Sequence, residues 1–177
     1  GQSTRVTALD PAQGAFATYP GGYEVGYCMF DRLVDFDENL RIVPSLATSW
    51  ELAADVKSVR FKLRQGVKFH DGTPFSADDV VFTLARAAGD GSDMRSYTND
   101  IKEVRKVDDH TVDIETKTPF PLLPGNMARV YIMSKKWSED NQATRPVDRR
   151  KGIENAASFR ANGTGPFRLR ERQPNVK

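Results

Sequence analysis

The sequence predicts an α/β fold in which a mixed sheet carries helices on its faces. Between Val59 and Leu63, apolar residues alternate with charged ones, which is the period of a strand with one wet face. From Ala77 to Ala88, apolar residues recur at spacings of three and four, so one stripe of a helix can pack on the sheet. Residues 104–107 and 111–115 flank a turn and predict a β-hairpin.

The stretch from the first strand to the first strong helix is the most regular part of the chain. Residues 67–70 are predicted as a second short strand between two glycine turns. Ser76 is expected to cap the helix, because its hydroxyl can accept a hydrogen bond from the backbone N–H of Asp79. Gly89 is expected to end the helix. The apolar stripe predicted to pack on the sheet consists of Ala77, Val80, Val81, Leu84 and Ala88.

The remaining elements are predicted from shorter patterns. Further strands are expected at residues 5–9, 34–37, 40–42, 130–133 and 167–169. Further helices are expected at residues 23–33, 134–137 and 153–159. Loops are expected at residues 14–22 and 90–100, at the prolines of 119–124, and at 143–150 as a charged, exposed connection. Cys28, the only cysteine, is expected to be buried, and one cysteine excludes a disulfide within the chain.

Composition is that of an ordinary globular domain. The 177 residues suffice for one domain or lobe, and the net charge of +2 arises from interspersed acids and bases. This balance predicts neither a nucleic-acid partner nor a membrane surface. The arginines of residues 145–151 and 168–172 are interrupted by acids and are expected on a solvated face. No leader pattern begins the chain, so we expect any signal peptide to have been removed or to lie outside this sequence.

No residue pattern predicts catalysis or a metal. His70 precedes Asp71 and His110 follows Asp109, but a metal site needs further ligands and a catalytic dyad needs a nucleophile. Turn chemistry is the expected role of both pairs. Residues 163–166 lack the lysine of a phosphate-binding loop, and neither G-x-S-x-G nor H-E-x-x-H occurs. We therefore expect no enzyme activity, no metal ion and no cofactor.

Five segments carry a resemblance to a known family. They are Leu9-Asp10-Pro11, PSLATSWE at residues 44–51, GVKFHDGTPFSADDVVFTLAR at 66–86, VDDHTV at 107–112 and GTGPFRL at 163–169. In this order and spacing, they resemble the periplasmic peptide-binding proteins of ABC importers. This is family 5 of the extracellular solute-binding proteins, the dipeptide- and oligopeptide-binding type. The resemblance spans nearly the whole chain.

The resemblance implies the first lobe of a type II periplasmic-binding-protein fold. Residues 1–30 and 158–177 would belong to the ligand-bordering domain, and residues 31–157 would form a smaller inserted subdomain. The second lobe is expected to be absent from this chain, because family members continue well beyond Leu169. Sheet edges and apolar surface would then be exposed, so we expect self-association and weak ligand binding.

The function that the resemblance implies is capture of di- or oligopeptides and their delivery to an ABC permease, in the periplasm or outside a membrane. Ligand contacts are expected from Thr18, Tyr19, Gly21 and Gly22, with Tyr23 and Tyr131 as further candidates. A plain connecting loop at residues 14–22 is the alternative. Other ligands handled by the family are glutathione, nickel complexes, oligosaccharides and haem. A chaperone-like interaction module and an enzyme or enzyme regulator built on the same domain also remain open.

Overall fold

The computed structural model describes residues 8–13, 20–148 and 151–172. Its helices are α2 (Pro20–Met29), α3 (Ala77–Ala88), α4 (Arg95–Thr98), α5 (Leu123–Met127) and α6 (Lys135–Asp140), with a 3₁₀ turn, η2 (Ala156–Ser158). Its strands are β1 (Val34–Phe36), β2 (Ile42–Pro44), β3 (Ala47–Leu52), β4 (Ser58–Leu63), β5 (Ile101–Asp108) and β6 (Thr111–Thr116). Sheets and helices alternate along the chain, which confirms the predicted α/β class.

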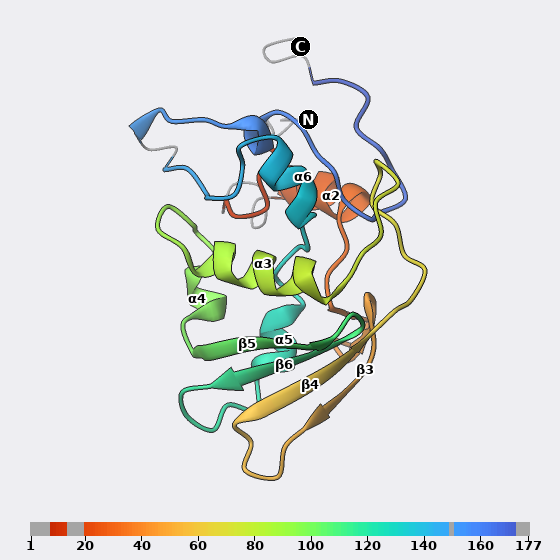
Figure 1. Ribbon diagram of the computed structural model, residues 1–177, viewed down its shortest axis with the longest axis vertical. Helices are drawn as coiled ribbons and strands as arrows, with labels where there is room; N and C mark the ends of the chain where they lie inside the picture. Colours follow the sequence, from red (N-terminus) through yellow and green to blue (C-terminus); the bar gives the residue numbers. More distant parts are fainter. Residues whose placement is uncertain (1–7, 14–19, 149–150, 173–177) are drawn as a thin grey trace.

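A four-stranded sheet forms one end of the molecule (Figure 1). Its order is β3-β4-β6-β5, and a separate two-stranded sheet pairs β1 with β2. All these pairs are antiparallel. Phe61 lies opposite Trp50 on one side and Val112 on the other, and Val59 lies opposite Ile114. The predicted alternation in β4 and the predicted hairpin of β5 and β6 are therefore confirmed.

Helix α3 crosses one face of this sheet, and α4 and α5 lie on the same side of α3 as the sheet (Figure 1). Its buried apolar residues Val80 and Leu84 share a core with Phe61 and Ile114 of the sheet and with Leu123 of α5. On the other side of α3 lie α2, α6, residues 8–13 and residues 151–172 (Figure 1). The N–H of Leu9 donates to the carbonyl of Ser158 at 3.2 Å, so segments far apart in sequence meet there.

The caps of the helices follow the sequence prediction. Ser76 caps α3 by accepting the N–H of Asp78, and the Asp79 carboxylate accepts a hydrogen bond from the Ser76 N–H, which completes a capping box. Ser134 caps α6 through the N–H of Trp137, and Gly89 caps the end of α3.

Three predicted strands are wrong. Residues 67–70 and 130–133 each contribute only one isolated bridge, Lys68 with Pro74 and Tyr131 with Arg32. The first bridge cannot grow into a ladder through Pro74, which has no N–H to donate. Residues 167–169 form no strand, and Phe167 is exposed. The apolar residues of 130–133 are buried, but by packing between α2 and α3 rather than by strand pairing.

The helix predicted at residues 23–33 is displaced toward the N-terminus. Helix α2 begins at Pro20, so Pro20–Gly22, predicted as loop, form its first turn. Proline suits the first helical position, because the N–H that it lacks would have no helical partner there. The helix ends at Met29, and Leu33 joins the main core outside it. Cys28 is exposed, so its predicted burial is wrong.

The structure differs from the sequence prediction in several smaller respects. Pro124 lies inside the first turn of α5, where a helix tolerates proline, although the prolines were expected to break regular structure. Ala143 and Pro146 are buried within the connection predicted as exposed. Ala88 is exposed and Ala87 is buried in its place on α3. Only η2 forms within the helix predicted at residues 153–159, and most of the strand predicted at residues 5–9 lies outside the described residues.

Candidate functional site

Three of the six predicted ligand contacts lie at the start of α2. Thr18 and Tyr19 lie outside the described residues, whereas Gly21, Gly22 and Tyr23 lie in the first turn of the helix. The first N–H groups of any helix have no partner within that helix, so they can bind polar groups from elsewhere. Two glycines in this turn leave the backbone open to close approach.

Tyr131 packs against the buried side of α2. Its side chain is 2% exposed and packs against Phe30, with ring centroids 6.1 Å apart. The Arg32 guanidinium lies 5.0 Å from the centre of the same ring. A Cβ at Gly26 would lie 3.0 Å from the Tyr131 ring, so any larger residue there would require the ring to shift slightly. Tyr131 is thus a core residue of this structure, and its contact with a ligand stays a prediction.

Arg32 joins the C-terminal half of α2 to β1. Its guanidinium pairs with the Asp35 carboxylate at 2.8 Å and donates to the carbonyl of Ala128 at 3.1 Å. It also stacks 4.2 Å above the Tyr27 ring, and the Tyr27 hydroxyl donates to Asp35. Sequence reasoning gave no role to Arg32, because a charge between apolar residues is no sign of burial without knowledge of its partners.

The turn at His70 contacts the glycine-rich segment at residues 163–166, which is part of one of the five segments that carry the family resemblance. His70 Nε2 donates to the carbonyl of Gly165 at 2.8 Å, and Nδ1 accepts the N–H of Gly163 at 3.3 Å. The side chains of Asp71 and Asn162 are hydrogen-bonded at 2.8 Å. Both histidine nitrogens are therefore engaged with the main chain of a distant segment rather than with their own turn, whereas Asp71 follows the turn prediction by accepting the N–H of Thr73 at 2.9 Å.

Both glycines of this segment pass directly over the end of α2. A Cβ at Gly163 would lie 2.0 Å from the carbonyl oxygen of Met29, and one at Gly165 would lie 2.7 Å from that of Cys28. These separations are too short for any side chain. The Gly165 N–H donates to the Met29 carbonyl at 3.1 Å. The GTGP motif therefore fits a close crossing of two backbones.

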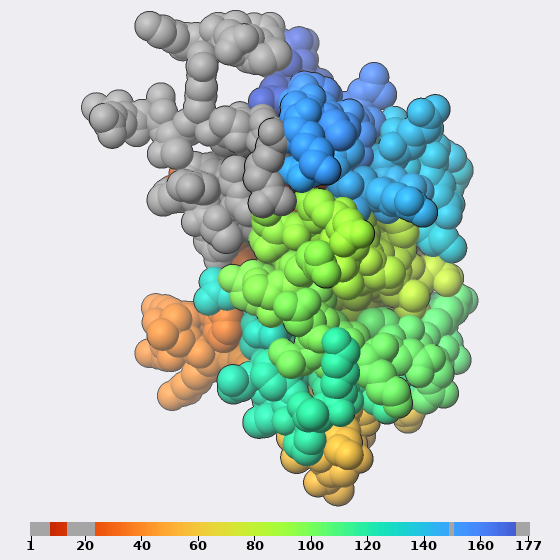
Figure 2. Space-filling model, turned by 90° about the vertical axis from the view of Figure 1, so that its left-hand side faces the viewer, coloured from red at the N-terminus to blue at the C-terminus, as the bar shows by residue number. Residues whose placement is uncertain are grey.

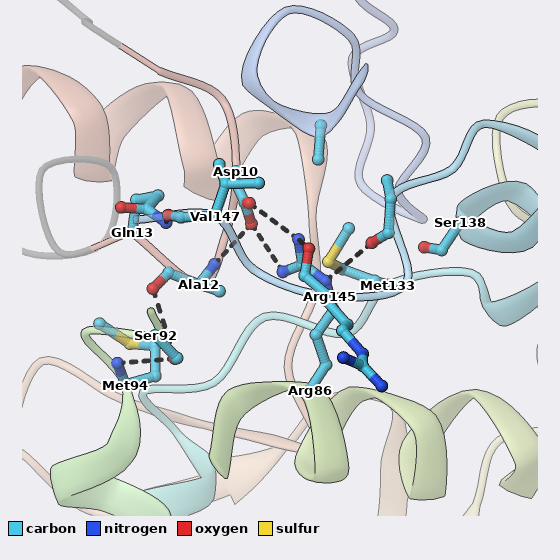
Figure 3. Close-up of polar contacts among 12 residues, drawn as sticks. Asp10, Ala12, Gln13, Arg86, Ser92, Met94, Met133, Ser138, Arg145 and Val147 are labelled. Carbon is cyan, nitrogen blue, oxygen red and sulfur yellow. Dashed lines mark hydrogen bonds and ion pairs between the residues drawn. The ribbon is translucent and has the colours of Figure 1, made fainter. Parts of the chain in front are cut away.

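A buried ion pair fixes the Leu9-Asp10-Pro11 segment (Figure 3). The Arg86 guanidinium of α3 binds both oxygens of Asp10, at 2.7 and 2.8 Å, and the two side chains are 2% and 0% exposed. Arg86 also donates to the carbonyl of Ala143 at 3.0 Å, and Asp10 accepts the N–H of Ala12 at 2.9 Å. Fork-like pairing of this kind satisfies both charges.

Two further polar residues of α3 share this side of the helix. The Thr83 hydroxyl accepts the N–H of Met133 at 3.0 Å and lies 3.3 Å from its carbonyl oxygen. Asp79 accepts the N–H of Lys135 at 2.8 Å. Burial raises the pKa of the Asp79 carboxyl above its ordinary value, and hydrogen bonds from the N–H groups of Lys135 and Ser76 oppose this shift.

Sequence reasoning missed this polar face of α3, which we define as Asp79, Thr83 and Arg86. One signal was present: the three residues recur at spacings of four and three, so they lie on one side of a helix. The Asp78-Asp79 pair was explained by the helix N-terminus alone, which is incomplete, because Asp79 also binds the segment after residue 133.

An open groove runs along the exposed side of α2. It has a volume of about 380 Å³ and is lined by Val25, Cys28 and Met29 of α2 and by Phe167 and Leu169 of the later segment, with polar residues at its edge. Cys28 thus lies on a largely apolar surface rather than in the core.

The described residues contain no cluster that would hold a metal ion and no helix that is long and apolar enough to span a bilayer. His110 is placed by its own turn, where the Asp108 carboxylate accepts its N–H at 2.8 Å. The polar groups described above bind main-chain atoms or one another. Their arrangement holds segments of the chain together.

Comparison with known proteins gives one consistent result. The sequence model of a family described as "Bacterial extracellular solute-binding proteins, family 5 Middle" matches residues 41–177. The chain is 30% identical over 165 residues to the glutathione-binding protein GsiB of Pectobacterium atrosepticum, a match that covers 92% of this chain and 30% of that protein. It is 29% identical over 167 residues to the dipeptide-binding protein of Escherichia coli, with coverages of 82% and 30%.

A solved structure supports the same fold. The oligopeptide-binding protein AppA from Bacillus subtilis, in complex with a nonapeptide, superposes with a TM-score of 0.81 at 24% identity, covering 99% of this chain and 34% of that chain. The predicted fold class is therefore confirmed. The chain spans about 30% of the length of the two curated relatives.

Proposed function

Because this chain belongs to the bacterial extracellular solute-binding proteins of family 5, we propose that it is part of a receptor that captures peptides and delivers them to an ABC permease. The observation that carries the proposal is the interlocking of the shared motifs: Asp10 with Arg86, and His70 with Gly163 and Gly165. These contacts would explain why the residues of these three motifs occur together in one lobe of a binding protein. A receptor of this class would work in the periplasm or outside a membrane.

The domain division is a proposal that the packing supports. Residues 1–30 and 158–177 would form part of the ligand-bordering domain, and residues 31–157 the inserted subdomain. Within the described residues, Leu9 bonds to Ser158 and Met29 to Gly165, so the two ends of the chain hold each other. In a receptor of this class, closure of two lobes about the ligand would complete the site.

Ligand contacts are proposed at Thr18, Tyr19, Gly21, Gly22 and Tyr23. The first turn of α2 would supply backbone N–H groups, and the glycines would let the ligand main chain approach them. Tyr131 would contribute by holding α2 in place and, as first predicted, by facing the ligand.

Glutathione is the principal alternative ligand, because one relative is named a glutathione-binding protein. Glutathione is itself a small peptide, so both readings use the same receptor chemistry. Nickel complexes, oligosaccharides and haem are further alternatives, and a chaperone-like module would bind unfolded chains instead.

The test is ligand-dependent thermal stability with di- and oligopeptides, glutathione, oligosaccharides and nickel complexes, measured on the protein that carries both lobes. A ligand that binds only the folded state raises the melting temperature by an amount set by its concentration relative to Kd. Peptides are expected to raise it, and a shift with another class alone would replace the peptide by that class. No shift from any ligand, with the fold intact, would contradict the receptor proposal.

A pair of variants localises the effect. Gly22→Ala places a methyl group where the ligand backbone is expected. The rise in melting temperature on addition of peptide should therefore become much smaller. The unliganded protein should be as stable as before, since alanine favours a helix. Lys136→Ala, on the exposed side of α6, is the control and should keep the shift.

A further inference from the structure

A second hollow lies on the inserted part of the chain, between the β1–β2 hairpin, α4 and α5. This hairpin groove has a volume of about 720 Å³, and the lining residues that matter here are Phe36, Leu40, Tyr97, Leu122, Asn126 and Arg129. In Figure 2 the hairpin, in orange, projects from the molecule beside the green and teal surface of the later segments. The groove involves none of the residues proposed above as ligand contacts.

Leu40 is the most unusual residue of the groove. It is 79% exposed and has a φ of 61°, a backbone conformation that strains a leucine. The turn around it is fixed by the Asp37 carboxylate, which accepts the N–H groups of Asn39 and Arg41 at 2.8 Å each. Glycine or asparagine would occupy such a position with less strain. Leu40 therefore contributes an apolar side chain at a position where stability alone favours another residue.

The groove has a second exposed apolar wall. Leu122, just before α5, is 68% exposed, and both it and Leu40 line the same hollow. Single exposed leucines are normal on a protein surface, whereas two that border one groove mark a place for an apolar group.

Arg129 gives the groove its polarity. It is the only charged residue among those lining the groove, and it is exposed. Its guanidinium lies 5.3 Å from the centre of the Phe36 ring, and it forms no ion pair with the described residues. Asn126, three residues earlier, donates to the carbonyl of Tyr97 at 3.3 Å and adds a side-chain amide to this edge. An arginine fork is the side chain best matched to a carboxylate.

We propose that the hairpin groove binds an apolar side chain that lies next to a free carboxylate, as in the C-terminal residue of a peptide. The apolar group would contact Leu40 and Leu122, and the carboxylate would bind Arg129. An acyl carboxylate such as a fatty acid presents the same chemistry, so the test includes both sources. This proposal does not depend on the ligand contacts proposed at the first turn of α2, and the experiments below test it separately.

The test uses binding and its location together. N-acetyl-Ala-Leu with a free carboxylate, the same compound as its C-terminal amide, and octanoate are titrated into the ¹⁵N-labelled chain. Affinity and the backbone amides that shift are then recorded by NMR. We expect the acid to bind about tenfold more tightly than the amide, as one charge-assisted pair would give. The shifts are expected at residues 36–42 and 122–129.

Two variants and one control variant separate recognition from folding. Arg129→Gln should abolish the preference for acid over amide, whereas Arg64→Gln, at an exposed arginine outside the groove, should keep it. Leu40→Asn should weaken the binding of the peptide acid and of its amide several-fold while leaving the free energy of unfolding unchanged or higher, because asparagine tolerates this backbone conformation.

The outcomes are distinct. Equal binding of acid and amide, an unchanged preference in Arg129→Gln, or shifts confined to other residues would overturn the proposal. Tighter binding of the peptide acid than of octanoate would assign the groove to peptide C-termini. Similar binding of both acids through Arg129 would support the same chemistry with acyl carboxylates as the source.

Discussion

The two faces of α3 hold the molecule together in different ways. Its apolar face packs Val80 and Leu84 on the four-stranded sheet. Its polar face (Asp79, Thr83 and Arg86) binds the Asp10 side chain before the helix and main-chain atoms of Met133, Lys135 and Ala143 after it. Apolar packing is not directional, so it fixes which layers meet. Hydrogen bonds are directional, so the polar face also fixes which backbone groups lie opposite the helix.

This difference has an energetic consequence. Removal of an apolar group leaves a cavity into which the surroundings can partly relax. Removal of one partner of a buried polar pair leaves the other partner desolvated and unsatisfied. We therefore expect the largest single loss of stability on the polar face, at its one ion pair.

Arg86→Met is expected to lower the free energy of unfolding by about 3–5 kcal/mol, because it leaves the Asp10 carboxylate buried without its cation. Urea denaturation followed by circular dichroism measures the change. The double variant Asp10→Asn with Arg86→Met removes both charges and should lose less than the single variant. A double variant that is as unstable as the single one would show that the unpaired charge is not the cause.

Leu84→Ala tests the apolar face and is expected to cost about 3 kcal/mol, through lost burial and the cavity that remains. Val81→Ala is the control on the same helix, because Val81 is only half-buried and its truncation should cost less. The same urea denaturation applies. Equal losses at the two positions would mean that the sheet does not pack on the Leu84 side of the helix as described.

Thr83→Val keeps the side-chain shape and removes the hydroxyl that joins α3 to both main-chain polar atoms of Met133. The expected cost is about 2 kcal/mol, from main-chain groups left without a partner in a buried place. Hydrogen exchange should accelerate at the Met133 amide more than at the amides of β4. A uniform acceleration across the chain would instead indicate a global loss without a local contact.

The sequence predicted the apolar face well and the polar face poorly, for a physical reason. Period-two alternation in β4 and the stripe containing Val80 and Leu84 report burial directly, because each residue type carries its own preference for water. Arg86 has the opposite preference and is buried only because Asp10, 76 residues away in sequence, meets it. A pair of this kind is visible only after the chain has folded.

The candidate sites were predicted to a similarly uneven degree. The resemblance directed attention to residues 18–23, and the structure adds that residues 20–23 form the start of a helix. The hairpin groove could not be predicted, because the strained conformation of Leu40 and the position of Arg129 above Phe36 depend on three-dimensional geometry. Residues 130–133 were assigned as a strand because buried apolar runs look alike in strands and in tightly packed connections.

The smallest expected effect distinguishes buried from surface carboxylates by the sign of their pH dependence. Burial raises the pKa of Asp79, so the folded state holds this proton more tightly than the unfolded state does. Its protonation therefore adds stability as the pH falls from the raised pKa toward about 3.9, the ordinary value. Asp113 on the sheet surface behaves oppositely, because the hydrogen bond from Arg60 lowers its pKa. Its contribution is present above about pH 3.9 and is lost as the pH falls through the lowered pKa.

Urea denaturation between pH 7 and pH 3 compares Asp79→Asn and Asp113→Asn with the unaltered protein. As the pH falls, the stability of the unaltered protein relative to Asp79→Asn should rise, and its stability relative to Asp113→Asn should fall. The Asp113 effect should weaken in high salt, because its partner Arg60 is half-exposed, whereas the Asp79 effect should persist. Differences of the same sign at both positions would mean that Asp79 is not desolvated in solution, and the contrast between the polar face of α3 and the sheet surface would fail.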